Sequence, residues 1–143
     1  MLKQDVNIYK EVQKNAEVAM KTIDVLSNKI FNEQLAIQAS KQSAEYSEIR
    51  NRAYDKLIEA KAEPYRSSYL ENAVLTGGIN YNTLFNTSTS KIAELLIKGS
   101  NSDVVNLRKA INHNGSAGET AKGLAQELIN LEGKNIERLN KYL

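Results

Sequence analysis

The sequence has no cysteine and no tryptophan, and only one histidine and one proline among its 143 residues. The absence of cysteine excludes disulfide bonds, thiolate zinc sites, iron–sulfur clusters and cysteine nucleophiles. The single histidine, His113, stands between Asn112 and Asn114 in a segment that predicts a loop, so we expect an exposed turn residue. A catalytic triad that depends on histidine is therefore not expected.

Long apolar runs, blocks of like charge and phosphate-binding loops are also missing. The longest apolar run, residues 92–97, is interrupted by Glu94 and is far shorter than the ~20 residues of a membrane-spanning helix. The first ten residues lack the apolar centre of a signal peptide, so we expect a cytoplasmic protein that does not bind a membrane. The 19 basic and 17 acidic side chains are spread along the chain, which favours solvated helix surfaces over a nucleic-acid-binding stripe.

Apolar residues at helical spacing dominate the first half of the chain. The first stripe alternates steps of three and four residues over about three heptads. It comprises Tyr9, Val12, Ala16, Ala19, Ile23, Leu26 and Ile30, and a second stripe comprises Leu35, Ala39, Gln42, Tyr46, Ile49, Ala53 and Leu57. The phase breaks near Phe31 and Asn32, and Asn32 suits a helix N-cap. This break predicts an antiparallel pair of helices rather than one helix continuing through residue 61.

The second half predicts helices in the same way. Thr87–Ser90 offers several N-caps before an apolar group that begins at Ile92, and Gly99 with Ser100 either kinks one helix or separates two. Ser116 and Glu119 have the spacing of a capping box that opens the last helix. The stripe of that helix comprises Ala121, Leu124, Leu128, Leu131, Asn135 and Tyr142.

The connector between the two halves predicts the topology. Pro64 suits the first turn of a short helix over Tyr65–Leu75, which Gly77 and Gly78 close. With the residues up to 86, this gives a connector of about 25 residues, enough to travel the ~30 Å length of a 20-residue helix. The expected fold is a single all-α domain over residues 1–143. It is a four-helix bundle of ferritin-like up-down-down-up topology, with a long crossover that contains the short helix.

Polar residues on the predicted seams are the first candidates for a functional role. Gln42 and Asn135 each occupy a position where an apolar residue is expected, and Tyr46 lies one turn from Gln42. Such residues specify register in coiled coils, and they could also line a small ligand cavity between helices. In the connector, Tyr65, Tyr69 and Tyr81 either cover one end of the core or form a protein interface, where tyrosine is enriched.

Carboxylates on facing helices are the candidates for a metal site, because di-iron and di-manganese bundles build their sites from glutamates and Glu-x-x-His motifs. The matching residues are Glu17, Glu45, Glu94 and Glu132. The helical period turns Glu17 and Glu94 towards water, whereas Glu45 and Glu132 flank the apolar stripe. Neither Glu45 nor Glu132 is followed at the third position by a histidine, so solvated surface charges are the other interpretation.

Two segments resemble a known family. Residues 87–100, TSTSKIAELLIKGS, and the ending GKNIERLNKYL are similar to short, uncharacterised ferritin-like proteins of Gram-positive bacteria. The resemblance covers the last two helices best, and it implies a four-helix bundle with a crossover and descent from a metal-binding ancestor. Members of that family have a histidine where this chain has Lys91, so no metal ligand is implied at that position.

Two functional hypotheses follow. The first is a non-enzymatic ferritin-like bundle without a cofactor, which acts as an interaction or structural module through its surface, as a homo-oligomer or with a protein partner. Under it Glu45 and Glu132 are exposed, and replacing either with alanine changes stability by no more than about 0.5 kcal/mol. The second is a degenerate metal- or oxidant-handling bundle that holds iron or manganese with the four glutamates.

Overall fold

A computed structural model describes residues 1–66 and 86–143 of the chain. These residues form four long helices and two short 3₁₀ turns, with no strand in the described part. The long helices are α1 (Lys3–Leu26), α2 (Glu33–Glu59), α4 (Thr89–His113) and α5 (Glu119–Leu139), and the 3₁₀ turns are η1 (Ser27–Lys29) and η3 (Asn140–Tyr142). The expected all-α, four-helix architecture is confirmed.

The predicted connector falls mostly outside this description. Pro64, Tyr65 and Arg66 are not helical, and the rest of the short helix predicted over Tyr65–Leu75 lies outside the described residues. The same holds for Tyr69 and Tyr81 of the predicted tyrosine cluster.

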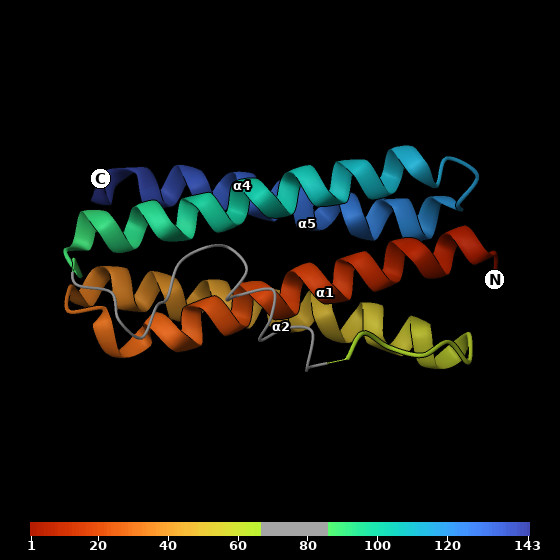
Figure 1. Cartoon of the computed structure of the whole chain (residues 1–143), viewed down its shortest axis with the longest axis horizontal. Helices are drawn as coiled ribbons and strands as arrows, with labels where there is room; N and C mark the ends of the chain where they lie inside the picture. The colour runs from red at the N-terminus through yellow and green to blue at the C-terminus, as the bar shows by residue number, and fades with distance from the viewer. Residues whose placement is uncertain (67–85) are drawn as a thin grey trace.

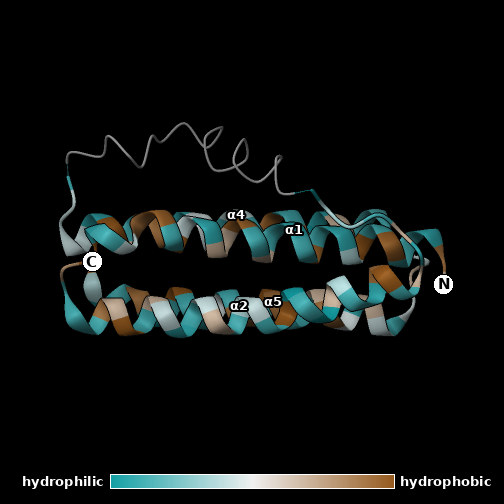
Figure 2. Ribbon diagram, turned by 90° about the horizontal axis from the view of Figure 1, so that it is seen from below, coloured by the Kyte–Doolittle hydropathy of each residue, from teal (hydrophilic) through white to brown (hydrophobic). Residues whose placement is uncertain are grey.

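The four helices lie side by side in two layers. Figures 1 and 2 together place α1 beside both α2 and α4, and α5 beside both α4 and α2. Contacts between helices fix their directions, because residue numbers rise in one helix as they fall in its partner. These contacts are Asn7–Asn114, Asn15–Asn106, Arg138–Glu45 and Arg52–Glu127. Helix α1 is therefore antiparallel to α4, and α2 is antiparallel to α5.

The ends of α1, α2 and α4 follow the signals in the sequence. Asn32 caps α2, since its side-chain oxygen accepts a hydrogen bond from the Leu35 backbone N–H at 2.9 Å. Ser88 caps α4 through a 3.2 Å bond from the backbone N–H of Lys91. Helix α4 continues through Gly99, so this glycine does not end the helix. The helix includes Asn112 and His113, the first two residues of the predicted loop, so His113 is the last residue of α4 rather than a turn residue.

The capping box predicted for the last helix is wrong. The N-cap of α5 is Gly118, not Ser116, and glycine has no side chain that could cap the helix. The Gly118 N–H instead donates to Asp5 Oδ1 of α1 at 2.7 Å, while Asp5 Oδ2 accepts from the Leu2 N–H at 3.0 Å. One carboxylate thus serves the N-terminal ends of two helices, where negative charge is favourable. A tertiary contact has replaced the local signal.

The predicted stripes meet in one core. Its largest fully buried apolar side chains come from all four helices: Ile8, Leu26, Leu35, Tyr46, Leu57, Ile92, Leu95, Leu107, Leu128 and Leu139. Burying each aliphatic side chain of this size stabilises the fold by about 1.5–3 kcal/mol. The outer faces of the helices are charged, and within residues 1–66 and 86–143 no helix is long and apolar enough to cross a membrane.

Adjacent residues of α2 provide a test of this core. Leu57 is fully buried, whereas 52% of Ile58 is exposed. We expect Leu57→Ala to lower the free energy of unfolding by about 2–5 kcal/mol, because it removes buried methyl groups and leaves a cavity. Ile58→Ala should change it by less than about 0.5 kcal/mol. Urea unfolding followed by circular dichroism measures both, and equal losses would contradict the assigned face of α2.

Candidate functional site

A network of polar side chains lies in the centre of the bundle. The Tyr46 hydroxyl of α2 donates to Glu132 Oε1 of α5, and Ser100 Oγ of α4 donates to the same oxygen at 3.1 Å. Asn135 Nδ2, one turn further along α5, donates to the Tyr46 hydroxyl at 3.1 Å. Asp103 of α4 is buried beside Glu132. Three helices therefore contribute to one dry cluster that contains two carboxyl groups.

Two acceptors in this network lack a donor. Within the described residues, Glu132 Oε2 and Asn135 Oδ1 are buried and have no hydrogen-bond partner. An orphaned buried polar atom costs about 1–3 kcal/mol, so a hydrogen-bond donor or a cation is favoured next to these two oxygens. A protonated Asp103 is the neighbouring side chain that can donate to Glu132.

Burial and charge shift the protonation of this network. Burial, followed by the interaction with the neighbouring Glu132 carboxylate, raises the pKa of Asp103 well above its usual range. Burial and the Glu132 carboxylate also raise the pKa of the Tyr46 hydroxyl, which stays protonated and remains a donor. The cluster thus favours states in which Asp103 is neutral or its charge is compensated.

Of these residues, Ser100 and Asp103 were not predicted from the sequence, where Gly99 and Ser100 were interpreted as an interruption of the apolar stripe. Their spacing does contain the signal. From Ile92 the buried face of α4 steps to Leu96, Ser100, Asp103, Leu107 and Ala110 by threes and fours. Continuing the phase of the stripe through polar residues would have placed both side chains in the core.

The glutamates proposed as metal ligands do not come together. Glu132 is fully buried, which corrects the expectation that it is an exposed surface charge. Glu17 is also not turned to water: it accepts a 2.7 Å bond from Arg50 Nε, and its side chain is 12% exposed. Glu45 lies on the surface at 3.8 Å from Arg138, and the exposed Glu94 pairs with Lys91 at 3.0 Å.

Because these glutamates are paired with cationic side chains, they are less suited to bind two metal ions. Hydrogen bonding to Lys91 lowers the pKa of Glu94, so its charge is already matched on the surface. In residues 1–66 and 86–143, no group of three or more His, Cys, Asp or Glu side chains is placed to hold a metal ion.

The other predicted polar residues are also buried. Gln42, Asn135 and Tyr46 have relative exposures of 1%, 0% and 2%. Gln42 accepts a 3.0 Å bond from Gln38 on its own helix and does not belong to the network around Glu132. A second buried glutamine, Gln13, was not recognised from the sequence; its side chain exchanges hydrogen bonds with the backbone of Tyr65 at 2.9 and 3.3 Å.

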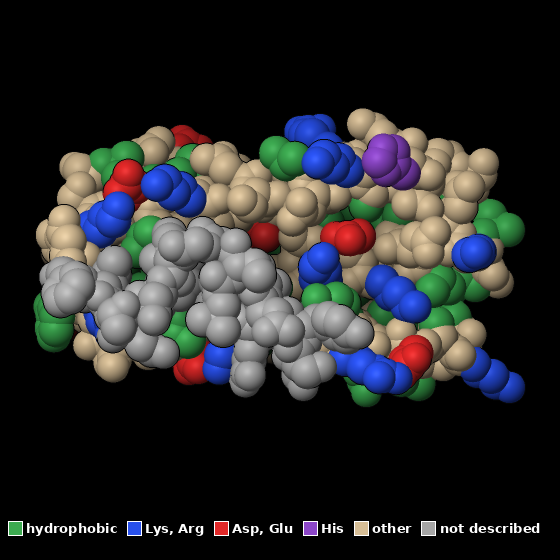
Figure 3. All heavy atoms as spheres, in the orientation of Figure 1, with side chains coloured by type: hydrophobic (Ala, Val, Ile, Leu, Met, Phe, Trp, Pro, Cys, Tyr) green, Lys and Arg blue, Asp and Glu red, His purple; other side chains and the backbone are tan. Residues whose placement is uncertain are grey.

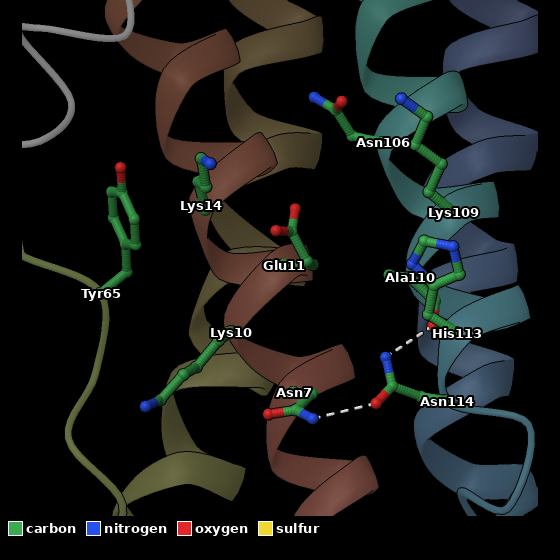
Figure 4. Close-up of a pocket in the computed structure, with 10 residues that line it drawn as sticks. All are labelled: Asn7, Lys10, Glu11, Lys14, Tyr65, Asn106, Lys109, Ala110, His113 and Asn114. Carbon is green, nitrogen blue, oxygen red and sulfur yellow. Dashed lines mark hydrogen bonds between the residues drawn. The ribbon is translucent and has the colours of Figure 1, made fainter.

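A groove on the surface lies between α1 and α4. This groove, of about 640 Å³, is lined by Asn7, Lys10, Glu11, Lys14, Tyr65, Asn106, Lys109, Ala110, His113 and Asn114. Figure 4 shows Asn7 and Asn114 pointing towards one another across it, with a hydrogen bond of 2.9 Å. Asn106 forms a second amide bridge, donating to Asn15 of α1 at 3.0 Å. These bridges fix the separation of the two helices along the groove.

The groove carries an excess of positive charge. Lys10, Lys14 and Lys109 face a single carboxylate, Glu11, which is engaged by Asn15 Nδ2 at 2.9 Å. None of these three lysines forms an ion pair with another described residue. The Lys14 ammonium instead lies 5.6 Å from the centre of the Tyr65 ring. His113 is exposed, as expected, and Figure 3 shows it near lysine and arginine side chains on this face.

Comparison with known proteins does not assign the chain to a family. No protein-family model matches it, and no curated protein is similar to it at a significant level. The arguments about function therefore depend on the network and the groove themselves.

The raised pKa of Asp103 predicts how stability depends on pH. In the unfolded chain the carboxyl loses its proton near pH 3.8, whereas in the folded chain it keeps the proton to higher pH. Between these two values the folded state binds more protons, so stability falls as pH rises, by at most about 1.4 kcal/mol per unit. We expect Asp103→Asn to abolish this contribution, because asparagine does not titrate.

Urea unfolding of both proteins between pH 4.5 and 8, in the presence of a chelator, measures the effect. The stability of the Asp103→Asn variant relative to the unmodified protein should increase with pH. A difference that is the same at every pH would show that Asp103 has an ordinary pKa in the folded protein.

Proposed function

We propose that the chain is a ferritin-like helical bundle that acts as a non-enzymatic binding module. We further propose that the groove between α1 and α4 recognises an acidic segment of a protein partner. The observation that carries this proposal is the positively charged lining of the groove. Its two walls, α1 and α4, are joined at a fixed distance by amide hydrogen bonds. A preformed, charge-complementary surface favours association because little ordering is needed on binding.

The helix directions support the ferritin-like part of the proposal. Helix α1 is antiparallel to both α2 and α4, so α2 and α4 run in the same direction (Figure 1). Joining two consecutive long helices that run in the same direction requires a connection that returns along the length of the bundle. The up-down-down-up order with a crossover between Glu59 and Thr89 has this property.

The composition of the groove favours carboxylates as the recognised groups. Three lysine ammonium groups donate hydrogen bonds and attract negative charge, and the asparagine amides add neutral donors and acceptors. Tyr65 and the aliphatic stems of the lysines provide apolar surface next to these charges. A peptide with several glutamate or aspartate residues matches this combination better than an apolar or basic one.

The alternative function, iron or manganese handling by the four predicted glutamates, has less support. Glu17, Glu45 and Glu94 are each engaged with an arginine or lysine, and only Glu132 is buried in the core. A carboxylate whose charge is already matched by a cation is a weaker metal ligand.

Titration with a hexaglutamate peptide, followed by NMR, tests the groove. We expect amide shifts at Asn7, Asn106 and Asn114, and weaker binding at higher salt because the attraction is screened. The double variant Lys14→Glu/Lys109→Glu should weaken binding at least about tenfold, since each reversal replaces an attraction by a repulsion.

The matched control is Lys41→Glu/Lys134→Glu, which reverses two exposed lysines outside the groove. It should leave the affinity within about twofold. Shifts distributed over all faces, or equal losses in both double variants, would contradict recognition by the groove. Equally tight binding of a single-stranded oligonucleotide would contradict the choice of an acidic protein segment, and sedimentation of the chain alone distinguishes self-association.

A further inference from the structure

A second, much smaller hollow lies beside the buried network. This pocket, of about 30 Å³, is lined by Val18, Ala19, Thr22, Ile23, Leu96, Gly99, Ser100 and Asp103. A space of this size accommodates one or two water-sized species. Gly99 is exposed at one side, and a Cβ built there would meet no atom within 4 Å, whereas Ser100 and Asp103 are buried. The pocket thus places Asp103 within reach of small species from the surface.

The network next to this pocket consists of hard oxygen donors. Asp103 and Glu132 contribute carboxylates, and Asn135 contributes the carbonyl oxygen that lacks a partner. The hydroxyl groups of Tyr46 and Ser100 both donate a hydrogen bond to Oε1 of Glu132, so they lie next to these carboxylates. Hard divalent cations such as Ca²⁺, Mg²⁺ and Mn²⁺ prefer carboxylate, amide carbonyl and hydroxyl oxygens.

Charge balance selects among the species that could fit. Two ionised carboxylates in a dry core repel one another and have lost their hydration, which is strongly unfavourable without compensation. One proton compensates half of the charge, a water molecule compensates none, and a divalent cation compensates all of it. The two buried acceptors without donors are also satisfied by a cation.

We propose that Asp103, Glu132 and Asn135 bind one hard divalent cation, which enters through the pocket between α1 and α4. This site is distinct from the four glutamates considered above, of which it contains only Glu132. It also does not depend on the groove, which lies further along α1 and α4. A cation bound here links α4 to α5 and stabilises the bundle.

Protons compete with such a cation. The titratable groups at the site are Tyr46 of α2, Asp103 of α4 and Glu132 of α5, and the residues that α1 contributes to the pocket wall do not titrate. A cation binds these carboxyl groups in their ionised form.

The test uses the full chain without a tag, stripped with a chelator and then titrated calorimetrically with Ca²⁺, Mg²⁺ and Mn²⁺. We expect one ion per chain for at least one of these metals, and an increase in the melting temperature on saturation. Asp103→Asn and Glu132→Gln should each weaken binding at least about tenfold, because each removes one of the two charges. Glu94→Gln, which alters an exposed carboxylate of the same helix, should bind as tightly as the unmodified chain.

Three outcomes would overturn the proposal. The first is no binding of any of the three metals at millimolar concentration to the folded, unmodified chain, which would leave a shared proton as the compensating charge. The second is binding that survives in Asp103→Asn, and the third is binding that is lost in Glu94→Gln; both would move the ion to the surface. If Glu132→Gln does not fold, the unmodified chain and Asp103→Asn decide the question.

Discussion

The buried carboxylate of Glu132 constrains the arrangement of three of the four helices. A carboxylate removed from water is tolerated only where donors replace its hydration, and its donors come from Tyr46 of α2 and Ser100 of α4. A slip of α4 by one turn would move Ser100 and Asp103 about 5.4 Å along the bundle and leave the carboxylate without that support. Apolar burial is non-directional, whereas the hydrogen bonds of this network require one register of α4 against α5.

Helix α1 is held in register by different contacts. It contributes no hydrogen bond to the network around Glu132 within the described residues, and its polar partners lie nearer the surface. Asn7 and Asn15 bridge to α4, and Glu17 pairs with Arg50 of α2 at 2.7 Å. These amide bridges also form part of the wall of the positively charged groove. The contacts that align α1 are therefore the contacts that shape the proposed binding surface.

The parts of the fold that depend on local chemistry were predictable. The phase break at Asn32 gave the turn between α1 and α2, and the hydroxyl groups before Ile92 gave the start of α4. The start of α5 was not predictable from Ser116 and Glu119, because the carboxylate of Asp5, more than a hundred positions away, accepts a hydrogen bond from the Gly118 N–H. Local signals fail where a distant side chain satisfies the same backbone group.

The candidate sites were harder to predict for a related reason. Period analysis based on apolar residues identified Gln42, Tyr46 and Asn135, since each interrupts an otherwise apolar stripe. It left out Asp103, and for Glu132 it left open a metal ligand or a surface charge, because a charged residue is normally evidence of exposure. A bundle helix buries a wider face than a two-stranded seam, so positions beside the stripe are also covered. Charge and periodicity then give conflicting predictions, and only the packing of α4 against α5 resolves the conflict.

Helix α4 contributes both to the buried network and to the contact with α1. Its inner face carries Ser100 and Asp103 towards the core, and three residues after Asp103 the side chain of Asn106 bonds to α1 at 3.0 Å. A helix moves nearly as a rigid body over such a short distance. A displacement of α4 that improved the surroundings of Asp103 would therefore disturb the bridge from Asn106 to Asn15. The core network and the amide bridge at the groove therefore favour the same position of α4, although they are made by different side chains.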